Sequence, residues 1–285
     1  MTNQLAYINM LSYGLGMNNA AQTNPSKFTS NTQAVVLHPD LPLTVTEAGE
    51  GRPVLILHGG GGPMTVAAIA AHLAESMHTI VPTHPGWNGT PRPEWFNGID
   101  DLALAYLQLL SDRGLRDVLV IGSSLGGWVA AEMALRDQSG IIAGLVLVGA
   151  TGVQVEGESI RSVFGLDLRS IAEYSFHDAS RFFFDPATLP PEQVARQRAN
   201  MATMKVVAGE NFDPKLLRRL ARVQTPTLAL WGESDRFVTP TYGKAYAAAF
   251  PKGHFEVIEK AGHLPHFEQP AAVFARIDAF RAGLT

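Results

Sequence analysis

The 285-residue chain contains no cysteine. A chain without cysteine forms no disulfide and no thiolate metal site, and it has no cysteine nucleophile. It also lacks any uninterrupted apolar run near the roughly 18 residues that a membrane-spanning helix needs. The first basic residue is Lys27, so the mildly apolar start lacks the charged segment that opens a signal peptide. We therefore expect a cytoplasmic protein with no membrane partner.

The chain also lacks a strong excess of either charge. It has 22 Lys and Arg against 26 Asp and Glu, and a pI near 6.1, so nothing in the net charge attracts nucleic acid. A hydrophobic content of 46% is enough for a substantial core, and 27 Gly and 18 Pro are too few to indicate disorder. We expect a small-molecule substrate and no nucleic acid as partner, and a homodimer stays open.

Strand-like and helix-like segments alternate over residues 34–150 and again over 223–285. Runs such as Pro53–His58 and Ile142–Val148 are apolar throughout, as in parallel strands that are covered on both faces. This alternation predicts an α/β fold with a mostly parallel, doubly wound sheet. The run Leu41–Thr46 instead alternates apolar and polar residues, which predicts an antiparallel edge strand.

Two stretches interrupt this pattern. Residues 1–33 show neither helical nor strand periodicity and contain many polar and turn-forming residues, which predicts a flexible N-terminal arm. Residues 151–222 contain no expected sheet strand and are broken by several prolines. They predict a helical cap inserted between strands, and most of its aromatic residues are expected to pack the cap onto the core.

A serine stands at an expected strand-to-helix turn. The apolar run Asp117–Ile121 leads into Gly122-Ser-Ser-Leu-Gly126, and a helix-like stretch follows. In the G-x-S-x-G pattern of a nucleophile elbow, the turn is too sharp for a Cβ at either glycine position. Ser124 fits this pattern, whereas Ser123 lacks a glycine two residues before it. Ser124 is therefore the candidate nucleophile.

Four glycines follow another expected strand. His58 ends that apolar run, and Gly59-Gly-Gly-Gly62 comes directly after it. A loop without side chains can turn its backbone amides towards a substrate, which is how an oxyanion hole is built beside a strand end. Glycine is also the commonest loop residue, so a flexible loop is the alternative. The position after a buried strand and upstream of Ser124 favours the oxyanion hole.

A serine hydroxyl needs a base within hydrogen-bond reach and an acid that orients the base. The chain offers Glu233 and Asp235 after one later strand, and His263 and His266 after the last strand. The order serine, acid, histidine differs from the orders in chymotrypsin and subtilisin and agrees with that of the α/β-hydrolases.

Four segments carry a resemblance to that superfamily. They contain the serine, the glycine run, the acidic loop and the histidine loop: Gly122–Gly126, His58–Gly62, Trp231–Asp235 and Gly262–Pro270. In this order they resemble the marker segments of the α/β-hydrolase superfamily, over roughly residues 41–281. The resemblance implies an α/β-hydrolase fold with 34–150 and 223–285 as the two parts of its core and 151–222 as its cap.

The resemblance also implies roles for individual residues. Ser124 would be the nucleophile, His263 the base and Asp235 the acid that orients the base. The oxyanion would be held by backbone amides at Leu125 and at Gly60 or Gly61.

Other residues of these segments have different expected roles. Glu233 is expected to be a solvated loop carboxylate and His266 a structural residue. A place at the border of the pocket stays open for His58 and His84.

The chain departs from the superfamily pattern at two positions. Thr83 stands where relatives often carry Asp, and Asn88 stands where many carry Gly. Asn tolerates a left-handed conformation better than most residues, so the turn is expected to keep its shape. The departures weaken any narrow subfamily assignment.

The expected activity is hydrolysis of a small or medium carboxylic ester, or a similar acyl compound, through an acyl-enzyme on Ser124. Carbon–carbon bond hydrolysis of meta-cleavage products, hydroxynitrile lyase activity and a ligand-receptor role are the alternatives within the superfamily. Relatives with an aspartate nucleophile are disfavoured by Ser124. No cofactor or metal is expected, because the histidines lack metal-ligand spacing and the glycine run lacks the Lys-Ser/Thr ending of a phosphate loop.

Overall fold

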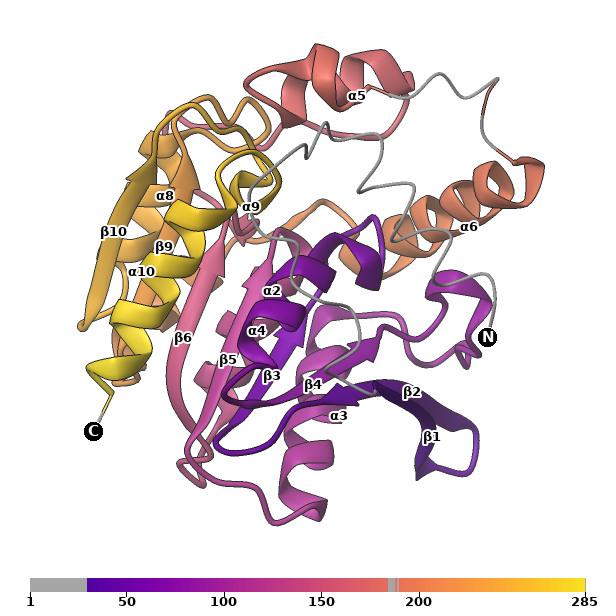
Figure 1. Cartoon of the computed structure of the whole chain (residues 1–285), viewed down its shortest axis with the longest axis vertical. Helices are drawn as coiled ribbons and strands as arrows, with labels where there is room; N and C mark the ends of the chain where they lie inside the picture. The colour runs from indigo at the N-terminus through magenta and orange to yellow at the C-terminus, as the bar shows by residue number, and fades with distance from the viewer. Residues whose placement is uncertain (1–29, 184–187, 189, 285) are drawn as a thin grey trace.

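The computed structural model describes residues 30–183, 188 and 190–284. Eight strands form one sheet in the order β1-β2-β4-β3-β5-β6-β9-β10, with helices on both faces (Figure 1). The β1–β2 and β2–β4 pairs are antiparallel and the other neighbouring pairs are parallel. The predicted α/β fold with a mostly parallel sheet is confirmed. The strands are Asn31–His38 (β1), Leu41–Ala48 (β2), Pro53–Leu57 (β3), His78–Thr83 (β4), Val118–Ser123 (β5), Ile142–Val148 (β6), Thr227–Gly232 (β9) and Gly253–Ile258 (β10).

The central strands are buried on both faces. In β5, Val118 and Val120 belong to one apolar cluster, whereas Leu119 and Ile121 belong to a second cluster. This division follows from the strand geometry, because successive side chains point to opposite faces of a sheet. The run is continuously apolar because neither face contacts water.

Helices α3, α4 and α8 pack with the first cluster, and α2 and α10 pack with the second. The helices of the core are η1 (Pro63–Val66), α2 (Ala67–Leu73), η2 (Trp87–Gly89), α3 (Ile99–Asp112), α4 (Leu125–Arg136), α8 (Pro240–Ala248), α9 (Pro265–Glu268) and α10 (Pro270–Ala282). Among the described residues, none of the helices has the length and apolar content that crossing a membrane requires.

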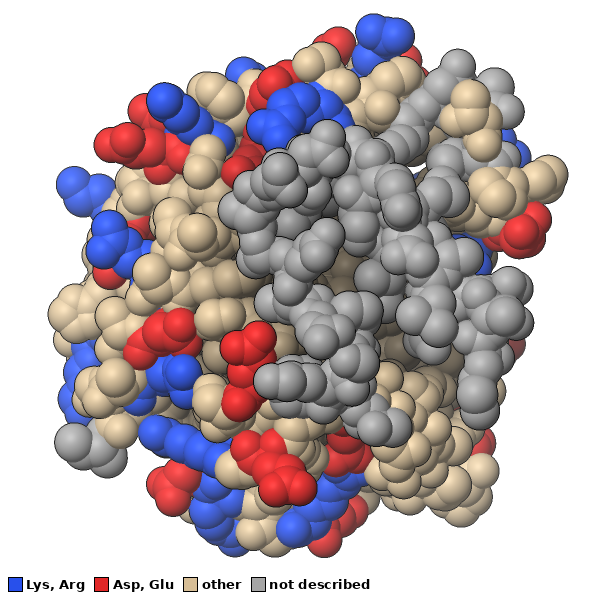
Figure 2. Space-filling view, in the orientation of Figure 1, with Lys and Arg blue, Asp and Glu red and all other residues tan. Residues whose placement is uncertain are grey.

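Side chains of both charges are mixed on the surface. On the face in Figure 2, basic and acidic residues lie close to one another over the left and lower parts. Ion pairs among the described residues include Arg113 with Glu47 and Arg219 with Asp213. Such pairs near the surface each contribute little to stability.

The edge of the sheet corrects two expectations. The sequence predicts β2 as an edge strand, but β1 pairs with its outer side. Strand β1 also begins at Asn31, inside the range 1–33 predicted as a flexible arm, and residues 1–29 lie outside the described residues. The first four residues of β1 are exposed on both faces, so only Val35 and Leu37 are left to give an alternating signal. Its polar side chains bond across to β2 instead, as in the 3.0 Å hydrogen bond between Thr32 Oγ1 and Thr46 Oγ1.

The described elements between β6 and β9 are β7 (Gly152–Val153), α5 (Leu168–Ser175), η3 (Ala179–Arg181), α6 (Pro191–Ala208), β8 (Phe212–Asp213), α7 (Leu216–Arg219) and η5 (Leu220–Arg222). Of these, α5 and α6 lie beyond the carboxyl ends of the strands (Figure 1), whereas residues of α7 and η5 lie near the far end of α4. These helices fall in the range predicted as a cap. The parallel β7–β8 pair was not expected, because strands of two residues are too short to give a periodic signal.

The order of the strands reverses between β3 and β5. The chain passes from β3 to β4 on one side, crosses to β5 on the other side and then continues outward to β6, β9 and β10. In open α/β sheets, ligands bind at the carboxyl ends of the strands where the order reverses. Gly59–Gly62 follow β3 and Ser124 follows β5, so both lie at this position.

Candidate active site

Ser124 joins β5 to α4 in a strained backbone conformation, with φ of 53° and ψ of −118°. Two glycines permit this turn. A Cβ on Gly122 would lie 2.2 Å from Gly126 O, and a Cβ on Gly126 would lie 2.2 Å from Leu57 O. The Ser124 amide donates a 2.9 Å hydrogen bond to Val148 O of the neighbouring strand. Because strain of this kind persists only where the surroundings hold it, the sheet and the two glycines together hold the serine in place.

Ser124, His263 and Asp235 form one hydrogen-bonded line. Ser124 Oγ lies 3.0 Å from His263 Nε2, and His263 Nδ1 lies 2.8 Å from Asp235 Oδ2. Because the carboxylate only accepts, Nδ1 carries the proton and Nε2 is left to accept the Ser124 hydroxyl. His263 is 8% exposed and Asp235 is 4% exposed. The structure thus brings together three predicted residues that come from three separate loops.

The second oxygen of Asp235 is held by the backbone. Oδ1 accepts hydrogen bonds from Phe237 N at 2.9 Å and from Val238 N at 3.0 Å. Such charge-assisted bonds stabilise a carboxylate that burial would otherwise destabilise. They also orient the group so that Oδ2 faces His263.

Glu233 and His266 lie outside this line. Glu233 is exposed, and its Oε2 accepts a 3.1 Å hydrogen bond from Lys260 N. His266 is buried, and its Nε2 donates to Thr65 O at 2.7 Å. Burial lowers the pKa of His266 to about 4, which keeps this imidazole neutral.

The first glycine of the run lies against the nucleophile. A Cβ on Gly59 would be 3.0 Å from Ser124 Cβ, whereas one on Gly60 would be 2.4 Å from Met204 Sδ. A Cβ on Gly61 would meet a side chain of its own loop at 2.8 Å. The sequence analysis selected Gly60 and Gly61 and gave no role to Gly59, where a side chain would crowd Ser124.

The amides of Gly60, Gly61 and Leu125 donate to no acceptor within the described part of the chain. Leu125 is the first residue of α4, and the first amides of a helix have no partner inside it. These groups are therefore available to an oxygen of a ligand, as an oxyanion hole requires.

Three successive carbonyls, those of His58, Gly59 and Gly60, accept hydrogen bonds from neighbouring groups. His84 Nε2 donates to His58 O at 2.9 Å, and His58 Nδ1 donates to Gly59 O at 2.7 Å. Trp87 Nε1 donates to Gly60 O at 2.9 Å. In a trans peptide the C=O points opposite to the N–H of the next residue. Fixing the Gly59 and Gly60 carbonyls therefore fixes the directions of the Gly60 and Gly61 amides.

The two histidines behind the loop form part of a buried network with Tyr106. Both are 0% exposed and their ring centroids are 3.8 Å apart. His84 N donates to His58 Nε2 at 3.0 Å, and the Tyr106 hydroxyl donates to His84 Nδ1. Burial lowers the pKa of His58 well below its usual value and that of His84 to about 4, so both are neutral. They support the glycine loop from behind instead of bordering the pocket.

This network predicts a stability effect for Tyr106→Phe. The substitution leaves His84 Nδ1 buried without its donor, so the free energy of unfolding is expected to fall by about 1–3 kcal/mol. Urea denaturation at pH 7.5 measures the change. Tyr174→Phe is the control, expected within about 0.5 kcal/mol of the unaltered protein because its ring stacks with Arg161 and is kept. Equal stability of both variants would contradict the role given to the hydroxyl.

Helix α6, in the range predicted as a cap, contacts the loop that follows β4 and the glycine loop. Asn88 N donates to Asn200 Oδ1 at 2.8 Å, and Asn200 Nδ2 donates back to Asn88 Oδ1 at 3.1 Å. Asn88 has a left-handed φ of 54°, which asparagine tolerates. One turn along α6, Met204 packs against Gly60. Helix α6 thus contacts the loop after β4 through Asn200 and the glycine loop through Met204.

A family model described as "Alpha/beta hydrolase family" matches residues 54–277. The chain belongs to the alpha/beta hydrolase family. Among curated relatives of this hydrolase, a 2-hydroxy-6-oxononadienedioate/2-hydroxy-6-oxononatrienedioate hydrolase of Pseudomonas putida is 28% identical over 80% of this chain and 87% of that protein. A 2-hydroxy-6-oxo-6-phenylhexa-2,4-dienoate hydrolase of Burkholderia cepacia is 24% identical over 90% of this chain and 96% of that protein.

Solved structures show the same fold for this hydrolase. An esterase from Thermogutta terrifontis has a TM-score of 0.72 and 24% identity, covering 90% of this chain and 100% of that one. A meta-cleavage product hydrolase from Pseudomonas fluorescens has a TM-score of 0.70 and 20% identity, covering 84% of this chain and 93% of that one. At these identities the likeness concerns the fold alone.

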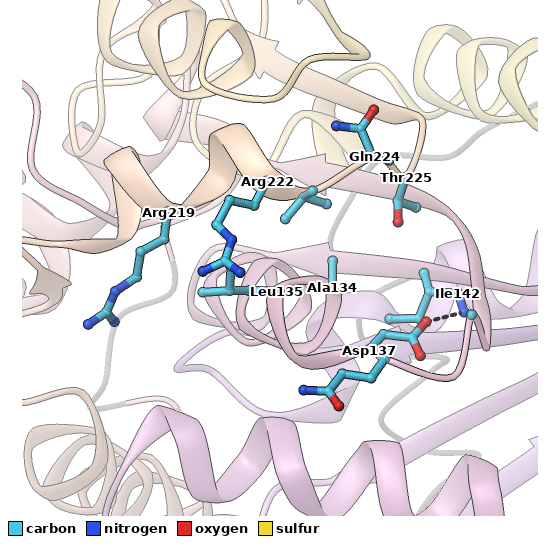
Figure 3. A pocket seen from close by; sticks show the side chains of 11 residues that line it. Ala134, Leu135, Asp137, Ile142, Arg219, Arg222, Gln224 and Thr225 are labelled. Carbon is cyan, nitrogen blue, oxygen red and sulfur yellow. Dashed lines mark hydrogen bonds between the residues drawn. The ribbon is translucent and has the colours of Figure 1, made fainter.

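A hollow of about 570 Å³ lies far from the triad, at the other end of α4 (Figure 3). It is bordered by Leu135 of α4 and Ile142 of β6, and Arg222 extends towards Leu135. Asp137 beside it accepts a 2.8 Å hydrogen bond from Ile142 N. Leu135 lies roughly 15 Å along α4 from Leu125 at 1.5 Å per residue. The hollow is therefore separate from the candidate active site.

Sequence reasoning missed the groups that support the glycine loop of this hydrolase. Trp87 follows a Pro-Gly pair after β4, and that turn is the signal that could have identified it. Tyr106 is one of several buried residues of α3 and no spacing distinguishes it from the rest. Its contact with His84 depends on how α3 packs beside β4.

Proposed function

We propose that this alpha/beta hydrolase is a serine hydrolase that cleaves small or medium-sized, uncharged carboxylic esters through an acyl-enzyme on Ser124. The observation that carries the proposal is the line of two hydrogen bonds, 3.0 Å and 2.8 Å long, from Ser124 through His263 to Asp235. Such a line supplies a base for the hydroxyl and an acid that orients the base.

Each step uses groups that lie at the site. Ser124 Oγ attacks the ester carbonyl carbon while its proton passes to His263 Nε2, and the carbonyl oxygen becomes an oxyanion. The amides of Leu125 and of Gly60 or Gly61 stabilise that oxyanion, by about 3 kcal/mol for each donor. His263 then protonates the leaving alcohol as the C–O bond breaks. A water that His263 deprotonates attacks the acyl-enzyme and releases the carboxylic acid.

The surroundings of the triad support an uncharged substrate. The Phe237 ring lies 5.5 Å from the His263 ring between centroids, and Met204 covers Gly60. Both side chains are buried and apolar. A charged acyl group buried against these two side chains would lose hydration, and neither side chain offers it a polar partner.

Carbon–carbon bond hydrolysis is the second candidate. It is supported by the curated relatives, whose names state that they hydrolyse dienoate compounds. The same serine attack on a carbonyl would then expel a stabilised carbanion in place of an alcohol. The dicarboxylate named for the Pseudomonas putida relative fits the apolar surroundings less well than an uncharged ester does.

The test is a pre-steady-state assay with the p-nitrophenyl esters of acetate, butyrate and octanoate, run beside 2-hydroxy-6-oxo-6-phenylhexa-2,4-dienoate. We expect a burst of p-nitrophenol followed by steady turnover, and no burst from Ser124→Ala. The preferred chain length would give the size of the acyl pocket. Consumption of the dienoate without ester turnover would favour carbon–carbon bond hydrolysis. If the folded protein consumed neither the esters nor the dienoate, both candidate functions would be contradicted.

A further inference from the structure

The carboxyl end of cap helix α5 points at the loops of the catalytic acid and base. The last carbonyls of a helix lack partners inside the helix. Here Arg236, next to the catalytic acid, donates to these carbonyls. Its Nη1 donates to Glu173 O at 2.5 Å and to Phe176 O at 3.1 Å. Its backbone N donates to Tyr174 O at 3.3 Å. A guanidinium at the negative end of the helix dipole is also electrostatically favourable.

The catalytic base is bonded to the same helix end. His263 N donates to Ser175 O at 2.6 Å. Gly262, the residue before the base, also packs closely against Ser175, because a Cβ on Gly262 would lie 2.2 Å from Ser175 O. The backbone of the base is thus in direct contact with the cap.

Glu268 completes this contact from the other side. Its Oε2 accepts from Gly262 N at 2.7 Å and from His177 N at 3.0 Å, while Oε1 accepts from Asp178 N at 3.0 Å. One carboxylate therefore receives three backbone N–H groups, two from the cap and one from the residue before the catalytic base. Charged acceptors make stronger hydrogen bonds than neutral ones.

We propose that Glu268 is a positioning residue for the catalytic base: its carboxylate fixes the loop of His263 to the cap segment 177–178, so that Nε2 stays in line with Ser124 Oγ. This inference rests on the proposed serine hydrolase function. Glu268 donates no proton in the reaction and acts only through the placement of His263. A glutamine at this position would offer one acceptor oxygen to the three N–H donors, so at least one of the three hydrogen bonds would be lost.

Labelling with a fluorophosphonate tests the inference, because this reagent reacts with an activated serine whatever the natural substrate is. The variants are Glu268→Gln and Glu268→Ala, and the matched control is Glu259→Gln, which removes the same charge from an exposed residue close to this loop. Intact-protein mass spectrometry gives both the rate constant of Ser124 labelling and the fraction finally labelled, and Ser124→Ala shows which label is specific.

We expect Glu268→Gln to lower the labelling rate constant about 10- to 100-fold, as misplacement of a catalytic group by an ångström does, with the final labelled fraction kept. Glu259→Gln should label at the unaltered rate. A merely structural role would instead lower the labelled fraction and leave the rate constant of the remaining molecules unchanged, and that result would overturn the inference. So would equal rates for Glu268→Gln and the unaltered protein. If the unaltered protein shows no Ser124-dependent labelling, the proposed function fails and this inference fails with it.

Discussion

Asp235→Asn is expected to lower kcat by about 10⁴-fold while the protein stays folded. Oδ1 would still accept from Phe237 N and Val238 N, so the amide group would turn towards His263. The imidazole would then face a donor at Nδ1 and would favour the tautomer with the proton on Nε2. That nitrogen could no longer accept the proton of Ser124.

Steady-state turnover of the best p-nitrophenyl ester measures the effect, with circular dichroism to show that the variant is folded. Glu233→Gln is the matched control, because Glu233 lies on the same loop but is exposed and bonds Lys260 N. Its kcat is expected to stay within about twofold of the unaltered value. The reverse pattern, with Glu233→Gln inactive and Asp235→Asn active, would give the role of the acid to Glu233.

Much of the fold could be predicted because the signals are local. Strand β5 is apolar at every position before Gly122, since both faces of the sheet are covered. Gly122 and Gly126 stand where a Cβ would collide with backbone, so the turn that displays Ser124 leaves a mark in the sequence. Strand β1 leaves only a weak one, because its first four residues are exposed and only Val35 and Leu37 pack against the core.

The hydrogen bonds that hold the loops of the candidate site could not be predicted, because they join residues that are distant in the sequence. His84 bonds to His58 and to Tyr106 across 26 and 22 positions, and neither spacing is periodic. Glu268 bonds His177 across 91 positions. Such contacts depend on how the predicted cap and the helices pack on the sheet. A single sequence contains no local pattern that indicates this packing. Ser124, Asp235 and His263 could be singled out because the proposed chemistry restricts the residue types, and the structure joins them by hydrogen bonds.

The buried histidines lead to a large expected effect of pH on stability. His84 and His266 each have a pKa of about 4 in the folded protein, lowered by burial from 6.5. Between these values the unfolded chain binds protons that the folded chain does not. Stability is therefore complete above pH 6.5 and is lost as the pH falls towards 4. At pH 5 each histidine is expected to cost about 2 kcal/mol relative to pH 7.5, and His58, lowered by burial in the same direction, adds to the loss.

Urea denaturation at pH 7.5, 6.5, 5.5 and 5.0 tests this expectation. His266→Gln keeps a donor for Thr65 O but cannot titrate, so the loss between pH 7.5 and pH 5 should shrink by about 2 kcal/mol. His254→Gln, at an exposed position, should leave the loss unchanged. If stability did not change from pH 7.5 to pH 5, the buried histidines would not be held neutral. Since domains are stable by only about 5–15 kcal/mol, an acid loss of this size would remove a large part of the free energy of unfolding before the carboxylates titrate.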